Sequence, residues 1–242
     1  MSGNRYQPFT LLLLLIFVAF LFDPAAFTPL FKWFADGNAP AIYQQDSLAW
    51  LTLQHLMLVV TATASSSLIA LFLAVLVTRP FGADFLPLSR SVVAIGQTFP
   101  PVAVLALCVP ILGFGNGPTL IALILYGLLP IFENALTALS TVPPPIVEAA
   151  RGSGMTQSQR LWQVELPLAL PFILAGIRIS AVISVATATI GSTVAAKTLG
   201  EVIVAGLQSY NYAFILQGGL LVAVLAFLVN QALTALEKRV RR

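Results

Sequence analysis

The residues that could do chemistry are few in this sequence, and their spacing does not favour catalysis. Residues 191–198 nearly match a phosphate-binding P-loop, but Ala196 stands where the second glycine should be. The run also ends an apolar segment, whereas a P-loop links a strand to a helix. The single histidine, His55, the single cysteine, Cys108, and the scattered acids form no metal cluster and no nucleophile–base pair. We therefore expect no catalytic site, metal or cofactor here, and we interpret His55 as a hydrogen-bonded packing residue.

The most informative spacing lies in a polar run, EAARGSGMTQSQRLWQVELP, which occupies residues 148–167 between apolar segments. Three prolines precede it, and proline is tolerated in a first helical turn, so we expect a short helix over roughly residues 144–151. Gly152 and Gly154 can adopt positive φ and turn the chain sharply. Because a polar helical turn cannot lie in hydrocarbon, we place this run at a membrane surface.

A second short helix is predicted to follow the glycines. Thr156 and Gln159 have the spacing of a capping box, which indicates a helix start at Thr156. We expect this helix to end before Pro167, because the residue ahead of a proline is disfavoured in helical geometry.

The polar run resembles the EAA loop of ABC-transporter permeases. The pattern is Glu-Ala-Ala, three residues, Gly, nine residues, an aliphatic residue, one residue and Leu-Pro, and this sequence fits it without departure. The resemblance implies a loop that docks in a groove of a separate ATPase subunit, which would bind the ATP and Mg²⁺. The residues it assigns to coupling are Glu148, Ala149, Ala150, Gly154, Met155 and Thr156.

Composition places these residues on a membrane scaffold. The 242 residues are 58% hydrophobic and 9% charged, against about 25% charged in soluble domains. We predict an all-α, polytopic bundle of about six spans, and the resemblance implies the type I ABC importer permease fold. The expected spans are Phe9–Phe22, Leu48–Thr78, Ser91–Leu112 with breaks at its prolines, Thr119–Ser140, Leu168–Val194 and Ala213–Leu236, with a short helix within Ala195–Tyr212.

The chain divides into an N-terminal unit, residues 1–50, and a permease domain, residues 51–242, with the coupling loop at 141–170. A leucine-rich core after a basic residue also describes a signal peptide, but Asp23-Pro24 follows it without a small-x-small cleavage site. We expect an uncleaved first span, short for a bilayer and extended at its ends.

Basic residues are distributed unevenly about the expected spans. One side would carry Arg5, Arg79, Arg90, Arg151, Arg160, Lys238, Arg239, Arg241 and Arg242, and the other only Lys32 and Lys197. The positive-inside rule then puts both termini and the EAA loop in the cytoplasm of a bacterial inner-membrane protein. Scattered over span ends, these charges do not form the basic face that nucleic acid requires.

Further segments resemble permeases of osmoprotectant importers, which carry glycine betaine, choline or related quaternary amines. They are residues 96–101 (GQTFPP), 109–115 (VPILGFG), 125–130 (LYGLLP) and 187–191 (TATIG). The resemblance implies a periplasmic substrate-binding protein, whose aromatic cage would suit a quaternary ammonium. It also implies a second permease subunit, either a related chain or a second copy.

Polar and proline residues within the spans are our candidates for the translocation path. They are Gln97, Pro100, Pro101, Asn134, Thr187 and Thr189. Glu133 and Arg178 lie about 10 Å and about 15 Å inside the expected cytoplasmic ends. Since unpaired charges at such depth are costly, we predict that they pair. The alternative is that Arg178 extends to the interface and Glu133 is protonated or faces water.

Two other functions stay open from sequence. The solute could be a polar amino acid rather than an osmoprotectant. The chain could also be a secondary transporter driven by an ion gradient, for which Glu133 is the candidate intramembrane acid. The EAA run argues against the secondary transporter.

Overall fold

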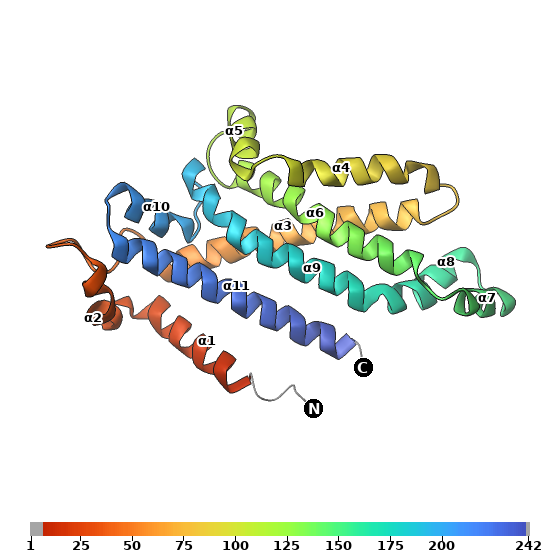
Figure 1. Cartoon of the computed structure of the whole chain (residues 1–242), viewed down its shortest axis with the longest axis horizontal. Coiled ribbons are helices and arrows are strands. Elements are labelled where there is room, and N and C mark those ends of the chain that lie inside the picture. The colour runs from red at the N-terminus through yellow and green to blue at the C-terminus, as the bar shows by residue number, and fades with distance from the viewer. Residues whose placement is uncertain (1–6, 241–242) are drawn as a thin grey trace.

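A computed structural model describes residues 7–240, and every regular element in that part of the chain is helical. Four long helices lie nearly side by side in an elongated bundle (Figure 1): α3 (Leu48–Val77), α6 (Asn116–Ser140), α9 (Leu166–Ala188) and α11 (Tyr212–Val240). Helices α3, α6 and α9 contact one another at the centre, and α11 packs on α9. The predicted all-α bundle is confirmed.

The number of spans follows from length and apolarity. Within the described residues, four helices are long and apolar enough to cross a membrane, and two bent helix pairs raise the number to six. The 30 residues of α3 extend about 45 Å at the α-helical rise, more than the roughly 30 Å of hydrocarbon. The expected bounds of the second, fourth and sixth spans agree with the structure to within a few residues.

The first bent pair joins α1 (Gln7–Phe22) to the short turns η1 (Pro24–Phe27), α2 (Thr28–Phe31) and η2 (Lys32–Phe34), at an angle of 110°. Asp23 stops α1, because its side chain accepts a hydrogen bond from the backbone of Ala26 and Pro24 starts the next turn. The expectation that the first span extends at both ends is therefore wrong at its C-terminal end.

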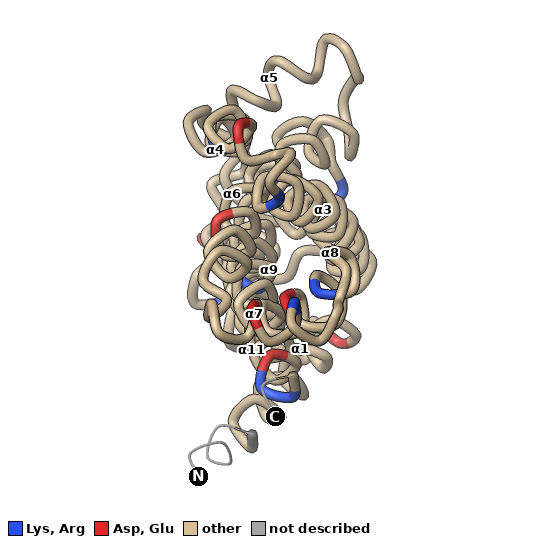
Figure 2. Tube along the Cα trace, turned by 90° about the vertical axis from the view of Figure 1, so that its right-hand side faces the viewer, with Lys and Arg blue, Asp and Glu red and all other residues tan. Residues whose placement is uncertain are grey.

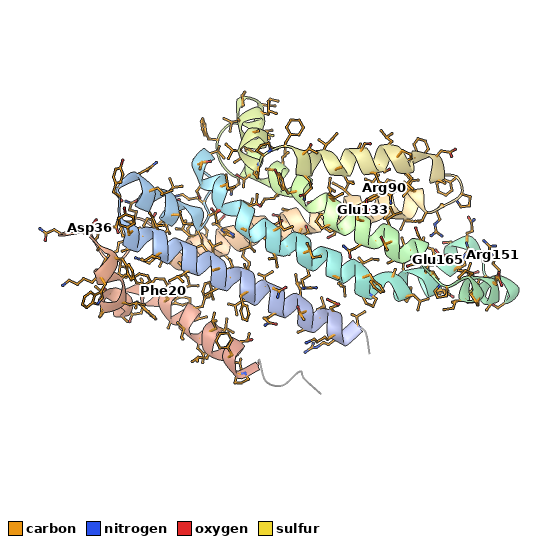
Figure 3. The ribbon with its side chains drawn as sticks, in the orientation of Figure 1. Phe20, Asp36, Arg90, Glu133, Arg151 and Glu165 are labelled. Atoms are coloured by element: carbon orange, nitrogen blue, oxygen red, sulfur yellow. The ribbon has the colours of Figure 1, made fainter. Side chains whose placement is uncertain are left out.

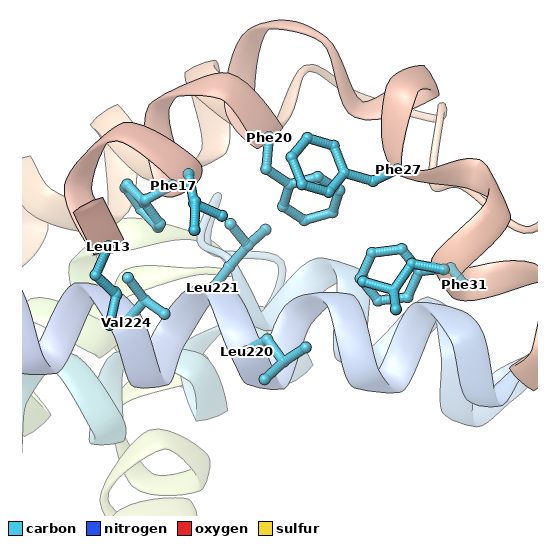
Figure 4. A pocket seen from close by; sticks show the side chains of 10 residues that line it. Leu13, Phe17, Phe20, Phe27, Phe31, Leu220, Leu221 and Val224 are labelled. Atoms are coloured by element: carbon cyan, nitrogen blue, oxygen red, sulfur yellow. The ribbon is translucent and has the colours of Figure 1, made fainter. Parts of the chain in front are cut away.

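The folded-back N-terminal segment forms an apolar groove against α11. The ring of Phe20 lies 5.4 Å from that of Phe31, centroid to centroid, and 5.0 Å from that of Phe27. Figure 4 shows Leu13 beside Val224 of α11 at one end of the groove and Phe31 at the other end, with Phe20 and Leu221 between them. The groove has a volume of about 200 Å³ and is lined on one side by the N-terminal segment and on the other by α11.

The second bent pair corrects the third span. Instead of one kinked helix over Ser91–Leu112, the chain forms η3 (Ala83–Phe85), α4 (Leu86–Thr98) and α5 (Pro101–Leu112), and α4 and α5 meet at 96°. Phe99 is extended, with ψ 137°, because two prolines follow it and the residue before a proline avoids helical geometry. Pro110 lies inside α5 without ending it.

The bundle has two distinct ends. The α7 end carries α7 (Pro144–Gly152) and α8 (Gln157–Arg160), and the α10 end carries α2, α10 (Gly200–Gln208) and the 3₁₀ helix η5 (Thr189–Val194). Figure 1 shows the first residues of α1 and the last of α11 on the side of α7. The short helix expected within Ala195–Tyr212 is α10.

Small residues let the three central helices approach closely at mid-bundle. A Cβ on Gly127 of α6 would lie 2.6 Å from Ser180 Oγ of α9 and 2.7 Å from Ser66 Oγ of α3. Ser66 donates to the carbonyl of Ile124 at 2.9 Å, which ties α3 to α6. Small side chains at helix contacts are typical of membrane bundles.

Candidate functional site

The two short helices at the α7 end project beyond the bundle (Figure 1), and Figure 2 views the molecule from that end. Helix α7 begins at Pro144 and presents Glu148 and Ala149 to solvent, whereas Ala150 is 6% exposed. The structure thus splits the predicted coupling triplet. Glu148 and Ala149 lie on an open face, and Ala150 is held within the chain.

The turn after α7 is a Schellman motif. Gly154 has φ +81° and donates to the carbonyl of Arg151 at 3.0 Å, while Met155 donates to that of Ala150 at 3.1 Å. This pair of bonds defines the motif, which needs a residue without strain at positive φ. The glycine turn was predicted, but Gly152 has no part in the reversal, since it is the last residue of α7.

Thr156 caps the second helix as expected. Its Oγ1 accepts from the backbone of Gln159 at 3.2 Å, and the Gln159 side chain accepts from the backbone of Thr156 at 2.9 Å. The reciprocal pair is a capping box, and it confirms the predicted helix start.

The predicted helix end before Pro167 is wrong. After α8 the chain forms a π turn, Leu161–Glu165, and continues directly into α9. Leu166 is helical, with φ −64° and ψ −44°, and donates to the carbonyl of Leu161. Pro167 is the second residue of α9 and lies inside a continuous helix that runs from Gln157 to Val194. The π turn directly before it already replaces the α-helical hydrogen bonds by i→i+5 bonds, which accommodates the proline.

A buried ion cluster lies at the base of the loop, and sequence reasoning missed it. Glu165 Oε2 accepts from Arg79 Nη2 at 2.6 Å, and Glu165 Oε1 interacts with Arg160 Nε at 2.7 Å. The three side chains are 6%, 10% and 8% exposed. The only sequence signal for the cluster was that each of its residues is a charge beside a span. Arg79 and Glu165 are 86 positions apart, and no local spacing predicts that they meet.

A cavity of about 300 Å³ adjoins this cluster. It lies between the end of α3, the end of α6 and the loop. Figure 3 labels two of its lining residues, Glu165 and Arg151, at the α7 end. Its lining includes Thr78, Arg79, Pro80, Ser140, Val147, Arg151, Gln157, Arg160 and Glu165. The polar side chains of the loop therefore meet α3 across a hollow, while Leu161 and Leu166 at the base of the loop share an apolar cluster with Val77 of α3.

The candidate path residues lie on or beside five elements, α4, α5, α6, α9 and η5, and make local contacts. Gln97 of α4 donates to the carbonyl of Tyr126 at 2.8 Å, and Asn134 of α6 donates to that of Pro130 at 2.8 Å. Thr189 donates to the carbonyl of Ala186 at 2.7 Å. These bonds satisfy the side chains within the chain and do not gather them into one pocket.

Exposure separates the remaining path candidates. Pro100 is exposed at the α4–α5 bend, and Pro101 and Thr187 are half-buried. The Tyr126 hydroxyl donates to the carbonyl of Phe99, which fixes the bend against α6. The α4–α5 bend is thus an ordered, open surface of this chain.

The predicted Glu133–Arg178 pair does not form among the described residues. Glu133 Oε1 of α6 lies 3.3 Å from Arg90 Nε of α4, and Figure 3 labels the two residues next to each other. Arg178 Nε lies 3.5 Å from Glu237 Oε2, and Arg178 Nη1 donates to Asn230 of α11. The two side chains leave their helices toward different neighbours, which is why the predicted pair does not form.

At the α10 end, neutral side chains bind backbone groups. His55 is fully buried; its Nε2 lies 3.0 Å from the carbonyl of Val185, and its Nδ1 accepts from the backbone of Leu199 at 3.3 Å. Nδ1 is therefore the acceptor and Nε2 carries the proton. The interpretation of His55 as a hydrogen-bonded packing residue is confirmed.

The segment before α3 is fixed in the same manner. Gln217 of α11 donates to the carbonyl of Ala41 at 2.7 Å and accepts from the backbone of Tyr43 at 3.2 Å. The Tyr43 hydroxyl donates to Glu201 at 3.0 Å. Burial, and then this carboxylate, raise the pKa of Tyr43 above its usual range.

Residues 191–198, the near P-loop, adopt a 3₁₀ turn followed by a left-handed residue, Ala195. Lys197 faces outward and contacts Asp46 Oδ2 at 3.2 Å and Glu201 Oε2 at 3.0 Å. The hydrogen bonds that Lys197 donates to Glu201 and then to Asp46 raise the pKa of the lysine. The lysine that a P-loop would aim at phosphate is thus engaged by two carboxylates.

Comparison with known proteins gives concordant results. Residues 66–242 match the family described as binding-protein-dependent transport system inner membrane component. The chain is 38% identical to the osmoprotectant import permease protein OsmY of Salmonella typhimurium, over 81% of this chain and 83% of that protein. It is 40% identical to the carnitine transport permease protein OpuCB of Listeria monocytogenes, over 78% and 85%.

Solved structures agree on the fold. A chain of the inward-facing MetNI methionine ABC transporter superposes with a TM-score of 0.70, at 23% identity, over 82% of this chain and all of that one. A chain of an amino acid ABC transporter superposes with a TM-score of 0.67, at 18% identity, over 90% and 98%. At such identities the superpositions show similarity of the fold alone.

Proposed function

The chain belongs to the family of binding-protein-dependent transport system inner membrane components, and on that premise we propose that it is the permease through which an osmoprotectant enters the cell. The substrate class is a small quaternary amine such as glycine betaine, choline or carnitine. Support comes from relatives named for osmoprotectant, carnitine and choline transport at 37–40% identity. As a permease subunit the chain does not hydrolyse ATP itself.

The observation that carries the proposal is the shape of the EAA run. Its Schellman turn and capping box hold α7 and α8 as a rigid, exposed pair beyond the bundle. We assign ATPase contact to Glu148, Ala149, Met155 and Thr156, and a shape-keeping role to Ala150 and Gly154. The partner ATPase binds ATP and Mg²⁺.

Charge supports a cytoplasmic position for the α7 end and both termini. Of the basic residues expected on that side, Arg79, Arg90, Arg151, Arg160, Lys238 and Arg239 are described, and Arg5, Arg241 and Arg242 lie outside the described residues. Lys32 and Lys197 belong to the opposite side. Cytoplasmic loops of membrane proteins carry such an excess of Lys and Arg.

The transport cycle follows from this placement. A loaded periplasmic binding protein docks at the α10 end, ATP closes the ATPase dimer, and the loop moves with it. The spans then alternate between inward-facing and outward-facing forms. A second permease, related or identical, covers the open α4–α5 surface, where Gln97, Pro100 and Pro101 would line the path together with Thr187 and Thr189 of this chain.

The division of the chain into residues 1–50 and 51–242 is part of the proposal. The family match begins at residue 66, and the preceding turns pack on α11 as an addition to the bundle. Asn134 and the Glu133–Arg90 contact belong to the permease domain.

Uptake by the reconstituted system tests the proposal. Proteoliposomes would contain this chain, its co-purifying permease and ATPase, and the binding protein, with radiolabelled choline, glycine betaine, carnitine, methionine and histidine offered in turn. We expect ATP-dependent uptake of at least one quaternary amine and none of the amino acids. Uptake of an amino acid alone would overturn the substrate class, and uptake driven by an ion gradient without ATP would overturn the transport class.

A further inference from the structure

We propose that Glu165 is a positioning residue for transport, through which displacement of α7 and α8 reaches α3 as well as α9. The inference rests on the proposed function, since it concerns how an ATPase would move the bundle. The chain joins the loop to α6 at one side and to α9 at the other. Helix α3 has no such covalent link to the loop, and the ion pair between Glu165 and Arg79 connects the two noncovalently.

The π turn is what makes Glu165 available for this task. Residues five apart on an α-helix point about 140° away from each other, at about 100° per residue. Arg160 and Glu165 are five apart and yet lie 2.7 Å from each other. The i→i+5 hydrogen bond from Leu166 to Leu161 brings them to one face. Such turns occur frequently at functional sites.

The second carboxylate oxygen reaches across to α3. Glu165 Oε2 accepts from Arg79 Nη2, two residues beyond the end of α3, at 2.6 Å. The neighbouring space is the cavity of about 300 Å³, with Thr78 and Pro80 on the α3 side and Val147 and Gln157 on the loop side. Val77 at the end of α3 also shares an apolar cluster with Leu161 and Leu166 at the base of the loop, so the ion pair adds a directional, charged connection to apolar packing that the hollow interrupts.

Burial makes this connection stiff. All three charged side chains are at most 10% exposed, so water and salt screen them little. Both oxygens of Glu165 are engaged, one by each arginine. Since charge-assisted hydrogen bonds in a desolvated site are strong and directional, a shift of α8 moves Glu165, and Arg79 must follow.

Helix α3 is a useful element to move. It contacts α6 and α9 along the centre of the bundle, and Ser66 ties it to α6 at mid-span. Its other end reaches the α10 end, where His55 contacts the backbone of Val185 and Leu199. Displacement received at Arg79 is therefore delivered along the whole length of the transport unit.

The test uses the reconstituted importer and the substitution Glu165→Gln, which keeps size and removes charge. We expect ATP hydrolysis to persist while its stimulation by the loaded binding protein, and the uptake per ATP hydrolysed, fall at least about fivefold, the lower range of site-to-site coupling. Glu133→Gln is the matched control, because Glu133 also pairs with an arginine but lies 40% exposed on α6. It should leave uptake per ATP unchanged.

A double variant separates transmission from stability. Glu165→Gln alone strands two buried arginines, whereas Arg79→Gln with Glu165→Gln removes one of them and should recover much of the lost Tm. Transmission requires the Arg79–Glu165 pair, so uptake per ATP should stay low in the double variant. Recovery of uptake together with Tm would overturn the inference, as would normal coupling in Glu165→Gln. Absence of ATP-driven uptake in the wild-type complex would instead reject the proposed function.

Discussion

The α7 end and the α10 end are stabilised by different chemistry. At the α7 end, buried charges are paired with each other, as in the Arg79–Glu165–Arg160 cluster. At the α10 end, the buried side chains His55 and Gln217 are neutral and bind backbone groups. Both arrangements satisfy buried polar groups, but only the first does so by pairing buried charges.

The difference fits the mechanical demands on each end. Several backbone hydrogen bonds, each worth about 1 kcal/mol net, hold the turns around Tyr43 and Leu199 in fixed positions. A few ion pairs across a cavity instead join rigid helices and leave space between them for movement. The end proposed to receive the ATPase is thus the one that can shift as a unit.

The largest expected effect on stability comes from Glu165→Ala. It strands Arg79 and Arg160 in a buried site, and breaking a buried pair in this way costs about 3–5 kcal/mol. That is roughly 10 °C in Tm for a chain of this size. Thermal unfolding of the purified chain in detergent measures it. A shift as small as that of an exposed ion pair would mean that the cluster is hydrated.

His55→Leu should have the next largest effect. The substitution keeps volume but leaves the carbonyl of Val185 and the N–H of Leu199 without their partner, a loss of about 1–3 kcal/mol for unsatisfied buried groups. The same unfolding experiment measures it, with hydrogen exchange at Leu199 as a local reporter. If hydrogen exchange at Leu199 stays slow in the variant, the bond from Leu199 to His55 does not hold this turn, and the proposed role of neutral side chains at the α10 end is wrong at this position.

Gly154→Val should separate transport from stability. Nothing lies within 4 Å of a Cβ at this position, so the cost comes from φ +81° alone, about 1–3 kcal/mol for a non-glycine residue. The reversal between α7 and α8 opens, and uptake should fall at least about fivefold at normal protein level.

Gly154→Asn is the matched control, because asparagine tolerates the left-handed region. It should retain most of the uptake. Equal loss in both variants would mean that side-chain bulk at the docking face, rather than backbone geometry, is what matters there.

Lys197→Met should have the smallest effect. Lys197 is half exposed, and surface pairs contribute about 0–1 kcal/mol, an effect that high salt should abolish. Since folding raises the pKa of Lys197, its contribution is present at neutral pH and is lost as the pH rises through the folded pKa in the alkaline range. Unfolding at two salt concentrations and two pH values checks both statements.

Local signals predicted the loop well. The glycine turn at Gly154 and the capping box at Thr156 depend on residues a few positions apart, and both formed as expected. Pro167 failed as a stop signal because the π turn directly before it shifts the hydrogen bonds to i→i+5, and the helix continues through the proline into α9. Local rules predict an element well when no neighbouring turn changes its register.

Contacts between distant segments could not be predicted. Depth along the membrane brought Glu133 and Arg178 to similar levels, but pairing also depends on the direction in which each side chain leaves its helix. Arg90 and Glu237 proved to be the neighbours. In the same way, nothing local connects Arg79 to Glu165, although that pair lies at the base of the candidate coupling loop.

The groove between the N-terminal turns and α11 has a consequence for biosynthesis. Phe17, Phe20 and Phe31 pack with Leu221 and Leu225 in one cluster, so α1 and the turns after it have as their partner a helix that is made about 200 residues later. At about 5–20 residues per second, the roughly 200 residues between them take about 10–40 s to make. During that interval lipid or the insertion machinery must cover the phenylalanines, and α1 reaches its final position only after α11 has been made.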